Sequence, residues 1–173
     1  MGIKRLWYAG PAKITAKLTG ALLAALIKDT EGCKEVKNIH QDTWNIEESE
    51  SSQDFYKNQL TGLTYRKGTK TMGEVTFNWT IGQYDYHLKA EFMGGIATDT
   101  SWERASGVVE INKTLIALTE DNQYCVLTNA SISAHEANTD GATGIAIVGT
   151  GMESPTEGVS QEYWFDSSEV VAA

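Results

Sequence analysis

The densest group of reactive side chains lies in the segment WNIEESESSQDFYKNQLTG, residues 44–62. Glu47, Glu48, Glu50 and Asp54 are four carboxylates within eight positions. Clustered carboxylates are typical ligands of Ca²⁺, and a pair of them can supply the acid and the base of glycoside hydrolysis. An EF-hand loop requires a central glycine, which positions 47–54 lack, and no further residue supports a glycosidase. We therefore expect a solvated acidic loop with no metal site and no catalytic residue.

The glycines near residue 150 suggest a different kind of site. The apolar run GIAIVGTGM, residues 144–152, leads into Gly149-Thr150-Gly151 in the way that a strand leads into a phosphate-binding turn. A dinucleotide fingerprint needs a third glycine and an immediate helix, and Glu153 would repel a phosphate. We interpret the segment as a strand that ends in a glycine-rich turn, and we expect no cofactor.

The histidines and cysteines do not form a recognisable site. His40, His87 and His135 lie far apart in the sequence, at spacings that do not fit a metal-ligand pair. Asp42, two positions after His40, can orient this histidine as a base, but the sequence around the pair does not indicate a nucleophile. The only cysteines, Cys33 and Cys125, give neither a disulfide framework nor a zinc motif, and we expect free thiols.

Hydrophobic patterns predict the elements that hold these residues. Leu18–Lys28 has strong helix formers, an apolar stripe and Thr19 as a cap, so it predicts a helix. Apolar or alternating runs predict strands at 36–46, 63–67, 74–81, 84–93, 107–118, 124–134, 144–152 and 162–165. The predicted fold is mainly β, an antiparallel sandwich or barrel in one domain over residues 1–173. The helix at 18–28 flanks it, and a long loop lies around 46–60.

The long loop at 46–60 is expected to make contacts. Trp44 and Ile46 before it, and Phe55, Tyr56 and Leu60 at its end, are predicted to tie both ends to apolar surroundings. A structureless loop of this length is uncommon inside a compact domain and is usually functional. Aromatic residues beside an adaptable polar run are also typical of protein interfaces.

Charge is distributed unevenly along the chain. The net charge of −9 disfavours binding to nucleic acid phosphates. Residues 1–28 contain five cations and no acid, whereas residues 114–173 contain nine acids and no Lys or Arg. Such polarity fits unlike surfaces that meet head to tail, although an ordinary solvated surface explains it equally well. The longest apolar run, Ala21–Ile27, is too short to cross a membrane, and nothing after Met1–Leu6 has the pattern of a signal peptide.

Several longer segments resemble one protein family. HQDTWNIEESESSQDFYKNQLTG (40–62), YRKGTKTMGEVTFNWTIGQYDYHLKAEFMGG (65–95), SWERASG (101–107) and EYWFD (162–166) are similar to prophage-encoded major tail, or tail tube, proteins of anaerobic gut bacteria. The resemblance extends over nearly the whole chain from Ile39 onward. It implies a β-sandwich or barrel with a flanking helix, six copies of which close a ring around a lumen that conducts DNA. It implies no catalytic residue, cofactor or metal.

The resemblance also implies roles for particular residues. The 46–60 loop matches the family's long loop between two strands, which contacts the next ring of the tube. The expected contacts between rings are Ile46, Glu47, Glu48, Glu50, Asp54, Phe55 and Tyr56, and the basic residues expected to receive them are Lys4, Arg5, Lys13 and Lys17. Polar positions of predicted strands make Glu74, Glu91 and Glu110 candidates for the lumen wall.

The partners that follow are further copies of this chain in stacked hexameric rings, other tail proteins, and DNA as passing cargo, with no membrane. The protein is then expected in the virion tail after synthesis in the host cytoplasm.

A tube protein of a contractile injection system would share these features. A carbohydrate-binding β-sandwich is another class, because the five tryptophans can stack on sugars (Trp7, Trp44, Trp79, Trp102 and Trp164). A hydrolase with a Glu/Asp pair ranks last.

Overall fold

Alternating apolar side chains place most of the chain in antiparallel strands. The computed structural model describes residues 2–171, and the predicted mainly-β fold with a flanking helix is confirmed. The elements in chain order are β1 (Ile3–Ala9), η1 (Pro11–Lys13), α1 (Gly20–Lys28), β2 (Cys33–Glu35), β3 (Asn45–Glu48), β4 (Ser52–Lys57), β5 (Thr64–Thr71), β6 (Val75–Ile81), α2 (Tyr86–Met93), β7 (Ile96–Ala97), β8 (Trp102–Glu103), β9 (Asn112–Thr119), β10 (Gln123–Thr139), β11 (Ala142–Gly151) and β12 (Glu162–Asp166).

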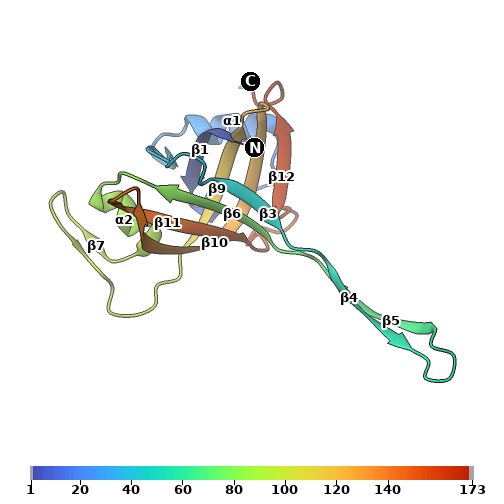
Figure 1. The fold of residues 1–173 in the computed structure, drawn as a ribbon. Coiled ribbons are helices and arrows are strands. Elements are labelled where there is room, and N and C mark those ends of the chain that lie inside the picture. The colour runs from blue at the N-terminus through green and yellow to red at the C-terminus, as the bar shows by residue number, and fades with distance from the viewer. Residues whose placement is uncertain (1, 172–173) are drawn as a thin grey trace.

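One eight-stranded sheet forms the body, in the order β2-β1-β9-β10-β11-β6-β3, with β12 paired to β10. Strand β10 is 17 residues long and belongs to two layers. Its first part lies between β9 and β12, and from Ala130 onward it pairs with β11. The register with β9 is interrupted between Leu127 and Ala130, where the strand changes layer. Figure 1 shows the two layers crossing each other, with β3, β6 and β11 on one and β1, β9 and β12 on the other.

The main core lies between these two layers. In β6 the residues Val75, Phe77, Trp79 and Ile81 are buried, and the residues between them are half-exposed, as the alternation predicts. Side chains from β1, β9 and the first part of β10 meet them from the other layer. The aromatic rings of Trp79 and Phe92 make an edge contact, with 5.9 Å between their centroids.

A second, smaller core lies under helix α1. Successive residues of β1 alternate between the two cores: Tyr8 points to the main core, and Trp7 and Ala9 point to the opposite face. Leu23 of α1 is fully buried against that face. The Thr19 side chain accepts a hydrogen bond from the amide of Leu22 at 3.3 Å, which confirms the predicted cap.

The prediction of a strand at Tyr84–Met93 is wrong, because residues 86–93 form helix α2. The Asp85 carboxylate caps its first turn by accepting a hydrogen bond from the amide of Leu88. Gly94 ends the helix with a φ of 73°, which favours glycine. Leu88 and Phe92, four residues apart, give the helix its core-facing side. A short apolar run fits both the helical and the strand periodicity, and here the capping residues at the two ends favour the helix.

Other boundaries also differ from the prediction. Strand β1 was not predicted, although Leu6–Ala9 is buried. The predicted strand at 36–46 is mostly irregular, and β3 starts only at Asn45. The remaining predicted strands overlap β5, β6, β9, β10, β11 and β12.

Candidate functional site

The most distinctive feature of the molecule is a long β-hairpin that leaves the body. We call residues 49–73 the arm; it contains β4 and β5, which pair only with each other in the described structure. In Figure 1 the arm extends far from the two layers and ends in a turn between Asn58 and Leu63. The prediction of a structureless loop at 46–60 is therefore wrong: these residues belong to β3, β4 and the turn of a hairpin.

The arm presents apolar side chains to solvent. Leu60 is 95% exposed and Phe55 is 54% exposed. The other large exposed apolar residues of the arm are Tyr56, Leu63, Tyr65 and Met72. The expectation that Phe55, Tyr56 and Leu60 anchor the end of the loop in apolar surroundings is wrong for the single chain. Exposed apolar groups on a protruding element are typical of a surface that another molecule covers.

The arm is firmly attached at its root. Trp44 is buried against Phe77, and Ile46 packs against the main core, so the predicted anchors before the loop are confirmed. The amide of Ser49 donates a hydrogen bond to the carbonyl oxygen of Glu74 at 3.0 Å, and the Ser49 hydroxyl accepts one from the Glu74 amide at 2.8 Å. Gly73 is required here because a Cβ atom would collide with the Ser49 carbonyl.

Charge changes sign along the arm. The root acids, as we call Glu47, Glu48, Glu50 and Glu74, lie where the hairpin leaves the sheet. Three of them line an open hollow of about 450 Å³ together with Ser49 and Thr76. Beyond the root, the hairpin carries one acid, Asp54, and four cations. We call these the distal-arm cations: Lys57, Arg66, Lys67 and Lys70. The acidic loop of the prediction is thus only the base of an arm whose outer part is basic.

The N-terminal basic residues that were predicted to contact the acids of the next ring are Lys4, Arg5, Lys13 and Lys17. Most of them already have partners in their own chain. Arg5 makes two hydrogen bonds of 2.7 Å to the Glu35 carboxylate, which lowers the pKa of Glu35. The ammonium group of Lys13 lies 3.1 Å from Asp29. Lys4 donates to the side-chain oxygen of Asn122, and Lys17 is exposed.

The same N-terminal strand borders a hollow of the surface. It measures about 730 Å³ and lies between the start of β1 and residues 36–44. Its charged groups are of both signs, and some of them have partners: His40 lies 3.1 Å from Asp140, and the amide of Gly2 donates to Glu120 at 3.2 Å.

The outer face of β3, β6, β11 and the second part of β10 forms a broad, nearly uncharged surface. Residues paired across an antiparallel sheet point to the same side, so the register defines this open face. Its members are Asn45, Glu47, Thr76, Asn78, Thr80, Ser131, Ser133, His135, Ala146, Val148 and Thr150. All are exposed or half-exposed. Among the described residues the open face has one acid and no Lys or Arg.

The acids proposed for a lumen wall lie elsewhere. Glu74 immediately precedes β6 and belongs to the arm root, and Glu110 is in the irregular segment before β9. Glu91 is in α2, where it pairs with Lys113 and with Lys34. The assignment of these three acids to polar positions within strands is therefore wrong.

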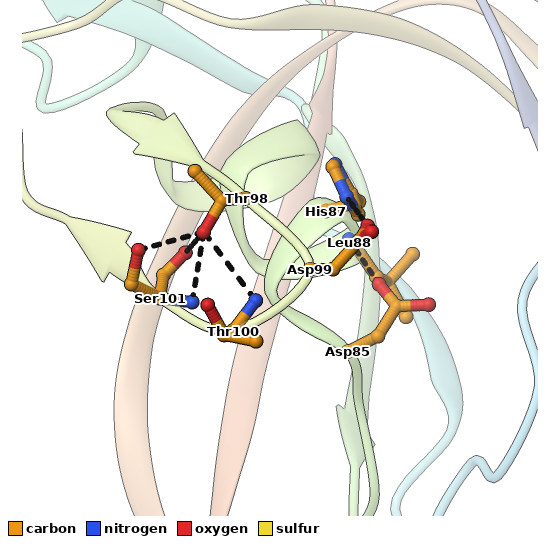
Figure 2. Close-up of polar contacts among 7 residues, drawn as sticks. All are labelled: Asp85, His87, Leu88, Thr98, Asp99, Thr100 and Ser101. Carbon is orange, nitrogen blue, oxygen red and sulfur yellow. Dashed lines mark hydrogen bonds and ion pairs between the residues drawn. The ribbon is translucent and has the colours of Figure 1, made fainter.

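Side chains that resemble catalytic groups also come close around the N-terminus of α2. Figure 2 shows the His87 imidazole 3.0 Å from the Asp99 carboxylate, which is the pair that would orient a base. Two of the hydroxyls drawn there are engaged with each other: Thr98 and Ser101 share a hydrogen bond of 2.7 Å. His87 and Asp99 are both largely exposed. The geometry is that of a loop tied to a helix end, without a nucleophile held by the histidine.

The tryptophans do not form a sugar-binding platform on one face. Trp7, Trp44 and Trp79 are buried, and Trp102 packs under the ammonium group of Lys89, 4.1 Å from the ring centre. Trp164 alone has a large exposed area, 44%. Trp79 lies on the apolar face of β6, within the main core.

The cysteines are free and buried, as expected. Burial raises the pKa of Cys33 to about 11, and burial together with the Glu162 carboxylate raises that of Cys125 further. Within residues 2–171, no three metal-binding side chains gather in one place. The helices in the same range lack the length and apolar composition that crossing a membrane requires. No model of a known protein family matches this chain, and no curated protein matches it.

Proposed function

We propose that this chain is a tail tube subunit, a virion structural protein that assembles with copies of itself into stacked rings. The observation that carries the proposal is the arm. It extends about 35 Å from Ser49 to Leu60 at roughly 3.3 Å per strand residue. It buries almost nothing in its own chain and exposes six large apolar side chains. Such an arm contributes little to the stability of a monomer, and contact with a second molecule gives it a role.

The open face supports the same function, as the wall of a conduit. DNA that passes through a tube must not be held, and Lys and Arg side chains would bind its phosphates. The open face has neither type among the described residues, and hydroxyl, amide and small apolar groups dominate it. We propose that this face lines the lumen and that DNA is transient cargo, bound without sequence preference.

The edges of the sheet support ring closure. β3 is an edge strand, and an unpaired edge is a hazard that closed rings remove. A heterologous contact between two different edges closes into a ring when the rotation between copies fits. We propose a ring of six copies, in a phage tail made in the host cytoplasm and joined to other tail proteins at its ends. A tube of a contractile injection system has the same physical requirements, and the neighbouring genes distinguish the two.

Electron microscopy of the purified protein at increasing concentration tests the proposal. We expect rings or tubes with a central channel. A second protein, in which residues 50–72 are replaced by Asn-Gly, should remain a folded monomer, because Ser49 and Gly73 already lie side by side at the arm root. A wild-type protein that stays monomeric at all concentrations would overturn the proposal, and normal tubes from the armless protein would overturn the role of the arm.

Two pairs of surface substitutions provide a matched comparison. Leu60→Ser with Leu63→Ser changes exposed apolar residues of the arm, and Ile96→Ser with Val108→Ser changes equally exposed ones elsewhere. We expect the first pair to impair assembly and the second to leave it unchanged. Circular dichroism should show the same β content in both.

A further inference from the structure

The two oppositely charged parts of the arm do not neutralise each other within one chain. None of the seven ion pairs within residues 2–171 includes a root acid or a distal-arm cation. The hairpin register places Lys70 opposite Gln53, Lys67 opposite Phe55 and Arg66 opposite Tyr56, so the cations face uncharged partners. The arm points away from the body (Figure 1), and Lys57, Arg66 and Lys67 lie further along it than Lys70, which is opposite Gln53 and nearer the root.

The arm root is arranged as a receiving surface. Glu47, Glu48 and Glu74 line one hollow, and like charges gathered in one place favour the approach of cations. The hollow adjoins β3, the edge strand of the body sheet, whose outer backbone groups are available for pairing. Acids on an edge strand prevent pairing with most other strands, but they favour a strand that carries Lys and Arg.

The N-terminal cations are less suitable partners for the root acids. Arg5 and Lys13 already pair with Glu35 and Asp29 in their own chain. Using them between copies would require breaking those contacts. The distal-arm cations are exposed, have no acidic partner in the described chain, and lie on an element that reaches beyond the body.

We propose that the arm of one copy docks across the arm root of a second copy, with its distal-arm cations against the root acids. The inference rests on the proposed self-assembly and specifies its contact. Each copy offers one basic arm and one acidic root, so the contact is heterologous and propagates from copy to copy. The exposed apolar residues of the arm, Phe55 and Tyr56 among them, are covered in the same contact.

Charge reversal tests this pairing. The arm-reversed protein carries Arg66→Glu, Lys67→Glu and Lys70→Glu, and the root-reversed protein carries Glu47→Lys, Glu48→Lys and Glu74→Lys. We expect each protein alone to need about tenfold or more higher concentration for assembly, measured by sedimentation velocity and electron microscopy. An equimolar mixture should assemble again, because each arm then meets a root of opposite charge in the other protein.

Two control proteins have the same changes in net charge at exposed positions away from the arm. One carries Lys17→Glu, Lys28→Glu and Lys37→Glu, and the other carries Asp121→Lys, Glu153→Lys and Glu157→Lys. Both are expected to assemble like the wild type. The first control also tests Lys17, one of the N-terminal cations, as a partner of the root acids.

The outcomes separate the inference from the proposed function. If the wild type assembles and the arm-reversed protein assembles equally well, the docking is wrong and the function stands. Failure of the mixture to recover assembly would also overturn the docking. If the wild type never assembles, both proposals fall together. Assembly of the wild type that weakens with added salt, with recovery only in the mixture, supports the docking.

Discussion

At the scale of single residues, a few side chains connect the layers of the body. Trp79 is 1% exposed and joins β6 to α2 through its contact with Phe92. The ammonium group of Lys89 is buried between the Trp102 ring and the Glu136 carboxylate, so it ties α2 to β10 and to the segment around β8. Such contacts keep the body rigid while the arm extends from it.

Replacing Trp79 with Ala is expected to lower the free energy of unfolding by about 3–5 kcal/mol, because a large cavity remains in the core. Trp164→Ala is the matched control, since that side chain is 44% exposed, and its effect should be under about 1 kcal/mol. Urea denaturation measures both. Equal effects of the two substitutions would contradict the assignment of Trp79 to the centre of the core.

Glu91 makes stability depend on pH. Burial alone would raise its pKa, but the hydrogen bond and charge of Lys113 and the charge of Lys34 outweigh burial and lower the pKa in the folded state. A carboxyl whose pKa is lowered by folding stabilises the folded state at pH values above its pKa in the unfolded chain, about 4.3. This stabilisation is lost as the pH falls through the pKa of the folded state. Glu91→Gln should therefore be less stable than the wild type at pH 7, and the difference should vanish in acid. Denaturation at pH 7, 5 and 3 measures it, and a constant difference would contradict this reasoning.

At the scale of elements, end-capping contacts decide between helix and strand. The sequence DYHLKAEFM alternates weakly and also fits a helical period, and the Asp85 cap and Gly94 settle it as a helix. The hairpin arm shows the opposite case. β4 and β5 expose both faces, so no alternation of buried and exposed residues marks them as strands.

Asp85→Ala is expected to destabilise the protein by about 1 kcal/mol through loss of the α2 cap. Asp99→Ala removes the nearby partner of His87, which is an exposed pair, and should change stability by less than about 0.5 kcal/mol (Figure 2). Thermal unfolding followed by circular dichroism compares them. A larger effect at Asp99 would mean that the loop contact, rather than the cap, holds the helix.

At the scale of the whole molecule, charge and shape are unequally distributed. Residues 114–173 of the body contain nine acids and no Lys or Arg, and the arm, which extends away from the body, carries four cations. The open face carries no Lys or Arg among the described residues.

Limited digestion with trypsin should cut the free subunit first at Lys57, Arg66, Lys67 or Lys70, because a hairpin without core contacts opens easily. Residues 114–173 should persist as part of one large fragment, since they contain no Lys or Arg. In assembled material the same sites should be protected. First cleavage at Lys28 or Lys37, which are also exposed, would contradict the expectation that the arm opens before the body does.

The sequence by itself determined the mainly-β class, the helix at 18–28 with its Thr19 cap, most strands of the body, the free cysteines and the anchoring of Trp44 and Ile46. These features follow from the spacing of apolar residues along short segments, which determines both the secondary structure and the side chains that are buried. The sequence also marked residues 44–62 as unusual. It did not distinguish a loop from a hairpin, because strand pairing between residues 52–57 and 64–71 leaves no burial pattern when both faces are solvated.

The tertiary structure decided which charges lie together. In the sequence, Glu74 is distant from Glu47 and Glu48, and only the pairing of β3 with β6 brings them to one hollow. The cations at 57–70 follow the acids closely along the chain, yet the extended hairpin carries Lys57, Arg66 and Lys67 away from the root. Long-range pairing, which no local pattern specifies, therefore turned an acidic loop into an arm with an acidic base and a basic outer part.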